Sequence, residues 1–288
     1  ENGSKKVGAE LNYRINQNTR INSEVSVQEN LEDNNKRRLA KIEMIRQIKQ
    51  YEFKVGYRHT EEELEGDNNS TEKLTNDTLL LGGRYTTKND KVTLRTDLEK
   101  NMSAKNGSEI SPDRLIVGVD VKLAQGFSVF AEHETTDNGS LKTHNNRIGL
   151  SKNLWKGAKA RTTYTQELTN EGQRNYATIG LTQNVKLNDK ISADFSIDQA
   201  KTIGDNSTQQ RFNDDEPKIQ GAEHDDYTAF SVGLNSNDED WSWSTRAEYR
   251  NGELYDKANF IASITRHYSN GKNLNAKLFF CFKFTFFC

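Results

Sequence analysis

The chain of 288 residues has a formal net charge of −2, only 33% hydrophobic residues and a mean hydropathy of −0.92. The near-neutral balance, without a basic stripe, gives no reason to expect nucleic acid as a partner. No stretch approaches the roughly 18 consecutive apolar residues of a membrane-spanning helix. Low hydrophobicity with 28% charged residues is also typical of disorder, but sustained alternation of apolar and polar residues argues against it.

This alternation fills the chain from one end to the other. Residues 51–58 read YEFKVGYR, and residues 191–198 read ISADFSID. Because successive side chains of a strand point to opposite faces, each such segment predicts a strand with one apolar and one polar face. The pattern predicts about sixteen strands in eight hairpins, at 6–15 and 20–29, 38–47 and 51–60, 78–88 and 91–102, 114–124 and 126–136, 145–155 and 158–169, 174–187 and 190–202, 227–236 and 241–251, and 257–268 and 273–287.

The predicted connections alternate in length. Within each hairpin they are short and rich in Asn, Asp and Gly, residues that tolerate the backbone angles of tight turns. Between hairpins they are mostly longer and acidic or Asn-rich, and long surface loops are predicted near 61–77, 104–113 and 204–226. Short turns at one rim and long loops at the other are typical of an outer-membrane barrel.

The chain therefore resembles a Gram-negative outer-membrane β-barrel of the porin or large-translocator kind. The resemblance covers nearly the whole chain and depends on strand length, strand alternation, loop alternation and aromatic residues near strand ends. It implies an all-β, antiparallel up-and-down transmembrane barrel of about 16 strands, forming one domain over 1–288. It also implies an outer-membrane location among lipid and lipopolysaccharide, and assembly by the outer-membrane insertion machinery.

If the apolar faces meet lipid, the alternate charged side chains point inward, because a charge facing lipid at mid-membrane costs roughly 2–4 kcal/mol. Both signs occur in similar number, which predicts a hydrated wall of ion pairs without strong ion selectivity. The predicted pore-lining residues are Arg58, Arg84, Arg95, Asp97, Glu99, Asp120, Lys122, Glu132, Arg161, Asp194, Asp198, Arg246, Glu248 and Arg250.

Candidate sites for chemistry are few, and we expect no catalytic residue, no metal and no cofactor. The most site-like cluster is 223–226, Glu-His-Asp-Asp, which is more simply a solvated acidic loop because no matching pair stands elsewhere. The acidic runs at 66–69, 213–216 and 238–240 could bind Ca²⁺, but none has a full calcium-loop spacing. Cys281 and Cys288 lie too far apart along one strand for a disulfide.

The leading functional hypothesis is a water-filled pore for passive passage or translocation of small polar solutes. The alternative is a membrane anchor or scaffold for a larger surface or envelope protein, which would then be its partner. A protease or lipase at the rim is a third hypothesis, and a soluble all-β protein is a weaker fourth. The oligomeric state stays open.

The predicted ends of the chain fit the resemblance poorly. Short turns inside each hairpin place the start of the first strand and the end of the last strand at the long-loop rim, whereas barrels of this kind usually keep both at the short-turn rim. The sequence also closes on Cys288 after a Phe-rich run. Either the strand count is wrong by one at each end, or the chain is part of a larger barrel.

Overall fold

The computed structural model describes residues 2–30, 35–65, 71–103, 111–139, 142–169, 172–205, 226–252, 256–268 and 272–284. Sixteen strands cover most of this part of the chain, and Ala124–Gly126 forms a turn of 3₁₀ helix. The strands are β1 (Asn2–Asn16), β2 (Thr19–Asn30), β3 (Lys36–Ile48), β4 (Tyr51–Glu65), β5 (Thr71–Thr86), β6 (Val92–Asn101), β7 (Asp113–Lys122), β8 (Phe127–Asp137), β9 (Lys142–Asn153), β10 (Ala158–Thr169), β11 (Gly172–Lys186), β12 (Ile191–Asp205), β13 (Tyr227–Asn237), β14 (Trp241–Gly252), β15 (Asp256–His267) and β16 (Lys272–Phe284).

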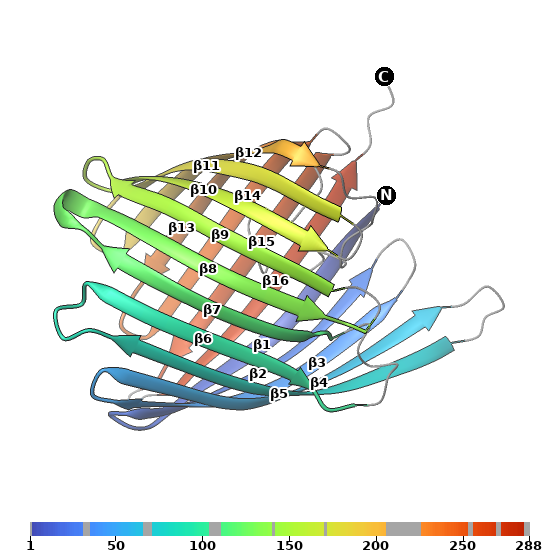
Figure 1. Ribbon diagram of the computed structural model, residues 1–288. Coiled ribbons are helices and arrows are strands. Elements are labelled where there is room, and N and C mark those ends of the chain that lie inside the picture. Colours follow the sequence, from blue (N-terminus) through green and yellow to red (C-terminus); the bar gives the residue numbers. More distant parts are fainter. Residues whose placement is uncertain are drawn as a thin grey trace.

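Every strand pairs antiparallel with the next, and β1 pairs with β16, so that the sheet closes into one barrel (Figure 1). The closing register runs from Asn2 opposite Lys283 to Tyr13 opposite Lys272. The fold class predicted from the alternation is thus confirmed. Of the two alternatives left open by the chain ends, a larger barrel is contradicted, because β16 supplies the partner that the edge of β1 requires. No helix in the described ranges is long and apolar enough to span a membrane.

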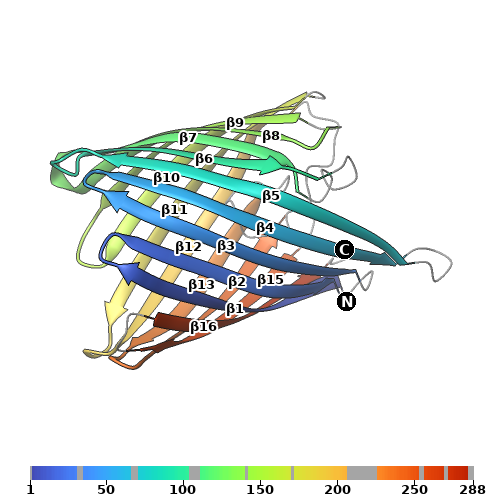
Figure 2. The same ribbon diagram turned by 90° about the horizontal axis from the view of Figure 1, so that it is seen from below.

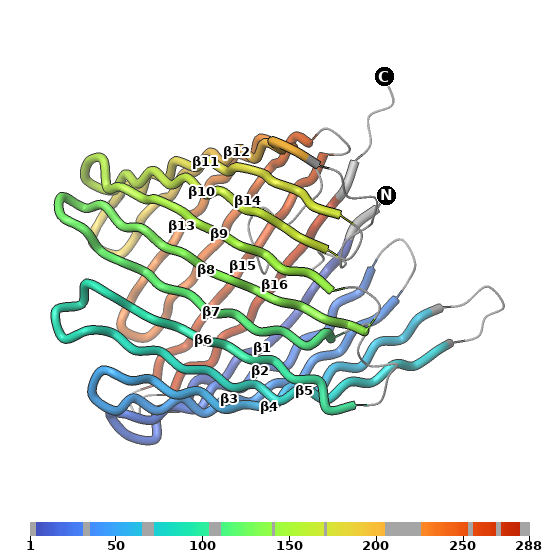
Figure 3. Tube along the Cα trace, viewed as in Figure 1, coloured from blue at the N-terminus to red at the C-terminus, as the bar shows by residue number. Residues whose placement is uncertain are grey.

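The chain meanders up and down around the barrel, and its two ends lie at the same rim (Figure 3). We call this end the loop rim, because it carries the connections 31–35, 66–70, 102–112, 138–141, 170–171, 206–226 and 253–255. The opposite short-turn rim carries the connections inside each predicted hairpin. The predicted position of both ends at the loop rim is therefore correct, and so is the strand count.

Hydrogen bonds between side chains and the nearby backbone, and glycine where φ is positive, stabilise tight turns of the short-turn rim. In the β11–β12 turn, the Asn188 Oδ1 accepts hydrogen bonds from the backbone N–H groups of Lys190 and Ile191, at 2.9 and 2.7 Å. The β9–β10 turn contains Gly157 with φ +82, a conformation that favours glycine. These turns confirm the short connections that the sequence predicts.

The loop prediction is correct only in part. The predicted loop at 61–77 is mostly strand, because β4 continues to Glu65 and β5 begins at Thr71. This pair of strands reaches further at the loop rim than its neighbours (Figures 1 and 2). The connections 102–112 and 206–226 are long in sequence, as predicted. Much of each, together with the acidic runs at 66–69 and 213–216 and most of the 223–226 cluster, lies outside the described residues.

The apolar side chains form the outer surface of the barrel. Ile179 is 60% exposed, Val25 57% and Ile148 55%, which is the reverse of a water-soluble core. Large apolar side chains with at least a third of their surface exposed occur on strands throughout the barrel. Near the loop rim the outer face also carries charged pairs, and Arg38 lies 2.6 and 2.7 Å from Glu61 and Glu63.

Candidate functional site: the inner wall of the barrel

The structure places all fourteen predicted pore-lining residues on the inner face of the barrel. Residues directly opposite each other in a sheet share a face, and the register joins them to one another. Thus Asp97 faces Gly82, Glu132 faces Arg147, and Glu248 faces Ser231. Their neighbours along each strand point outward. Their role in solute passage stays a prediction.

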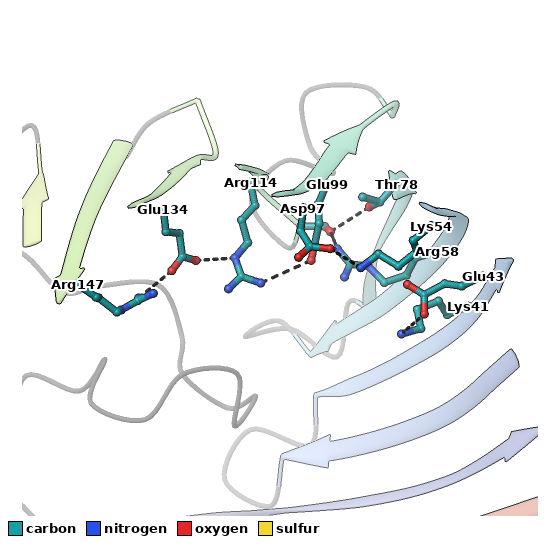
Figure 4. Close-up of polar contacts among 11 residues, drawn as sticks. Lys41, Glu43, Lys54, Arg58, Thr78, Asp97, Glu99, Arg114, Glu134 and Arg147 are labelled. Atoms are coloured by element: carbon teal, nitrogen blue, oxygen red, sulfur yellow. Dashed lines mark hydrogen bonds and ion pairs between the residues drawn. The ribbon is translucent and has the colours of Figure 1, made fainter. Parts of the chain in front are cut away.

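Seven inner side chains form a continuous chain of ion pairs across β4, β6, β7, β8 and β9, which we call the ion-pair network. The members, in order of contact, are Arg58, Glu99, Arg114, Glu134, Arg147, Glu132 and Arg95. Figure 4 shows the part that runs from Arg58 to Arg147. Each carboxylate lies between two guanidinium groups.

The distances within the network are short at its centre. Glu134 Oε1 lies 2.5 Å from Arg114 Nε, and its Oε2 lies 2.7 Å from Arg147 NH2. Glu99 lies 2.8 Å from Arg58 and 3.6 Å from Arg114. Planar guanidinium groups present several donors in a fixed geometry, so one arginine can serve two carboxylates on neighbouring strands.

The centre of this network is buried, whereas the side chain of Arg95 at its end is 38% exposed. Glu134 is 2% exposed, Arg58 6% and Arg147 8%, so these charges have exchanged water for one another. An ion removed from water is stable only when its partners remain in place. The buried centre is therefore a fixed part of the wall, and Glu134 and Arg147 are poorly placed to exchange partners with a passing solute.

Ser111 is part of the same wall, although the sequence places it in a surface loop at 104–113. It is 1% exposed, its Oγ accepts from Arg58 NH2 at 2.8 Å, and it lies 3.1 Å from Thr78 Oγ1. The prediction of a surface loop is wrong at this residue. The hydroxyl supplies one more acceptor to the guanidinium of Arg58.

The second part of the inner wall, on β12 to β15, is built from serines, asparagines and spaced charges. Arg246 donates to Ser231 Oγ at 2.6 Å and to Ser196 Oγ at 3.1 Å, and lies 3.6 Å from Asp194. The side chain of Arg246 is 42% exposed and that of Asp194 25%. These groups remain hydrated and can contact a solute. Asp198 accepts from Ser196 at 3.1 Å in the same region.

The remaining predicted residues make individual contacts. Lys54 pairs with Asp97 at 2.5 Å, and Glu248 lies 3.5 Å from Arg250. Two arginines stack on aromatic rings: Arg161 lies 4.9 Å from the Phe130 centroid and Arg250 4.0 Å from the Tyr227 centroid. The register sets Arg84 opposite Arg95, Asp120 opposite Thr93 and Lys122 opposite Ser128.

Three members of the network are absent from the predicted pore-lining residues: Arg147, which the alternation does assign to the inner face, and the two central members that it missed, Arg114 and Glu134. Both have the same parity along their strands as predicted inner residues, Asp120 on β7 and Glu132 on β8. A strict two-residue count within each strand would therefore have found them. Their mutual contact depends on the register between β7 and β8, which the sequence does not display.

The described residues include no group of three or more His, Cys, Asp or Glu side chains arranged to hold a metal ion. Of the acidic run 238–240, Asp238 accepts a hydrogen bond from Lys190 at 2.8 Å. Of the acidic cluster at 223–226, the structure describes Asp226, which pairs with Lys201 at 2.8 Å and accepts from the Thr202 backbone at 2.5 Å. Both carboxylates therefore have protein donors.

No protein-family model matches this chain, and no curated protein matches its sequence. Among solved structures, a bacterial polysaccharide outer membrane secretin superposes with a TM-score of 0.56 at 10% identity, over 99% of this chain and 98% of that chain. OccK11 (OpdR) of Pseudomonas aeruginosa gives 0.42 at 7% identity, over 99% and 96%. A triple-mutant porin of Rhodopseudomonas blastica gives 0.39 at 10%, over 98% and 99%.

The likeness to the secretin extends over nearly the whole of both chains and concerns the fold. The other two scores are too low to add to the argument. The chain thus has the closed antiparallel barrel fold of outer-membrane β-barrel proteins, as the resemblance implies.

Proposed function

We propose that this barrel forms a water-filled pore across the outer membrane and that small polar solutes pass through it. The observation that carries the proposal is the reversal of polarity across the sheet. The outer face exposes large apolar side chains, whereas the inner face carries charges of both signs. A barrel of about sixteen strands is wide enough to enclose an aqueous channel.

The outer surface supports insertion among membrane lipids. Aromatic side chains that suit the membrane interface lie near the short-turn rim, where Trp155 is 60% exposed and Trp241 47%. Near the loop rim, the pairs of Arg38 with Glu61 and Glu63 limit the apolar band. Lipid and lipopolysaccharide are the partners that this surface suits, and the outer-membrane insertion machinery would assemble it.

The inner wall supports weak ion selectivity. The ion-pair network contains four arginines and three glutamates, and Arg246 on the opposite strands is close to Asp194. Charges of opposite sign so close together cancel at the distance of a passing ion. The pore therefore suits small polar or zwitterionic solutes better than solutes with a large net charge.

Single-channel recording in planar bilayers tests the proposal. We expect discrete conductance steps with a reversal potential near zero in a salt gradient. Arg246→Glu should shift that potential toward cation selectivity, because this exposed side chain contacts the lumen. The matched control is Val232→Thr on the outer face of β13, which should leave it unchanged. A folded barrel without conductance would contradict the pore and favour the anchor of a larger envelope protein.

A further inference from the structure

A second polar cluster lies on the outer face of the barrel, on β8, β9 and β10 near the loop rim. Its members are His133, Thr135, His144, Asn146 and Gln166. They alternate along their strands with Glu132, Glu134 and Arg147 of the inner network, so they point the opposite way. β8, β9 and β10 are neighbours in the wall (Figure 1).

Apolar outer residues surround this cluster. Ile148, the next outward residue after Asn146 on β9, is 55% exposed, and Tyr164 on β10 is 41% exposed. On β7, Leu115 is opposite Thr135 and is 39% exposed. The cluster therefore lies where the apolar band gives way to polar residues. At this depth in a bilayer, the ester groups of lipids join acyl chains to head groups.

The hydrogen bonds of the cluster connect a hydroxyl, an imidazole and an amide. Thr135 Oγ1 lies 3.1 Å from His133 Nε2, and His133 Nδ1 lies 2.8 Å from Asn146 Oδ1. Asn146 Nδ2 donates to Gln166 Oε1 at 3.3 Å. On the other side of the hydroxyl, His144 Nδ1 lies 3.1 Å from Thr135 Oγ1.

One arrangement of protons satisfies all of these contacts together. Because Asn146 uses its N–H group on Gln166, its Oδ1 is left to accept, so the proton of His133 stands on Nδ1. In the neutral ring Nε2 then accepts, and Thr135 donates its hydroxyl proton to it. In this arrangement Thr135 Oγ1 accepts from His144 when the His144 proton is on Nδ1. The nucleophile, base and orienting group of a hydrolase have this same relation.

We propose that Thr135, His133 and Asn146 form a hydrolytic site that cleaves acyl esters of membrane lipids. Thr135 is the nucleophile, His133 is the general base, and Asn146 is a positioning residue that holds His133 in the reactive tautomer. His133 is exposed, so a lipid in contact with the outer face reaches the site without entering the barrel. This activity is separate from solute passage through the lumen.

In the first step Thr135 Oγ1 attacks the ester carbonyl carbon while His133 Nε2 takes the hydroxyl proton. The bond to the alcohol oxygen then breaks, and His133 gives the proton to that oxygen, which leaves with the head group. Water next attacks the acyl carbon and gives a proton to His133. The bond to Thr135 breaks, the threonine regains the proton, and the fatty acid leaves. One water is consumed for each ester bond broken.

The experiment uses the refolded chain in detergent micelles with a fluorogenic long-chain acyl ester, and in vesicles with a dye-labelled phospholipid. Thr135→Ala should lower kcat/KM by about 100-fold or more, because covalent and base catalysis are lost together. Thr135→Ser should retain the activity. A fluorophosphonate probe should label residue 135 in the wild type, as located by mass spectrometry of the digested protein.

Two matched controls keep the result interpretable. Thr162→Ala removes another exposed threonine from the outer face of β10, and His59→Ala removes a histidine of the outer face of β4. Both should leave turnover and labelling unchanged. Heat-modifiable migration on gels confirms that each variant has folded. Equal turnover by folded Thr135→Ala and wild type, or no turnover and no labelling in either, would overturn the proposal.

The role of Asn146 has its own readout in the pH profile. His144 is the titratable side chain that faces His133 within the described cluster, while β7 contributes Val117 opposite it and β8 contributes Ala131. Asn146→Asp should keep kcat within a few-fold and move the acid limb of kcat/KM to higher pH, because a carboxylate stabilises the imidazolium. Asn146→Leu should lower kcat at every pH. Unchanged profiles in both would remove Asn146 from the mechanism.

Discussion

Two parts of the inner wall accommodate their charged side chains in different ways. On β4 to β9 seven charges are joined into one network with a buried centre, where Glu134 is only 2% exposed between Arg114 and Arg147. On β12 to β15 Arg246 contacts serines and stays hydrated, as shown by the 42% exposure of its side chain. The first part is a structural element, and the second is a surface available to solutes.

The difference follows from what surrounds each charge. A buried carboxylate without its arginines pays the full cost of leaving water, so the network must form completely. An exposed pair loses little when one member is removed, because water replaces the partner. The same residue types thus fix the wall on one side and set the properties of the lumen on the other.

The largest loss of stability is expected for Glu134→Gln in the network. The amide has nearly the shape of the carboxylate but leaves two arginines without a charge between them, so we expect the free energy of unfolding to fall by about 3 kcal/mol. Urea unfolding of the barrel in detergent, followed by tryptophan fluorescence, measures it. A loss below about 1 kcal/mol would mean that both parts of the wall are equally hydrated.

A smaller effect is expected for Asp194→Asn in the hydrated part. Asp194 accepts from Asn235 at 2.8 Å and lies 3.6 Å from Arg246, but a quarter of its side chain is exposed. Unfolding in the same assay should change by less than about 1 kcal/mol. A loss comparable to that of Glu134→Gln would contradict the distinction drawn between the two parts of the wall.

The smallest effect concerns the turns that join the strands of the second part. The hydrogen bond from Lys190 lowers the pKa of Asp238 below its ordinary 3.8, with help from the Glu239 backbone. Since the folded pKa is depressed, the carboxylate stabilises the barrel above pH 3.8, and this contribution is lost as the pH falls through the folded value.

Unfolding midpoints of wild type and Asp238→Asn, measured from neutral pH down to acid, check this contribution. The wild type should be slightly more stable at neutral pH, and the two midpoints should converge below the ordinary carboxyl pKa. Lys190→Gln is the control for the other member of the pair and should give the same curve as Asp238→Asn. A difference that grows toward acid pH would contradict the assigned sign.

The sequence predicts most of the fold because its signal is local. The two-residue period identifies each strand on its own, and it assigned residues such as Arg58 and Asp194 to the inner face without any knowledge of their partners. It failed at 61–77, where acidic residues suggested a loop although β4 and β5 continue as strands. It also failed at Ser111, which looks like a loop residue and is held by Arg58.

The sequence by itself therefore determined the strands, their two faces and the short turns, since all three depend on neighbours along the chain. Only the tertiary structure decided that β1 closes onto β16, that seven charges on five strands form one network, and that Thr135, His133 and Asn146 meet on the outer face. The physical reason is register. Which side chains touch depends on how far each strand slides against the next, and parity alone leaves that distance open.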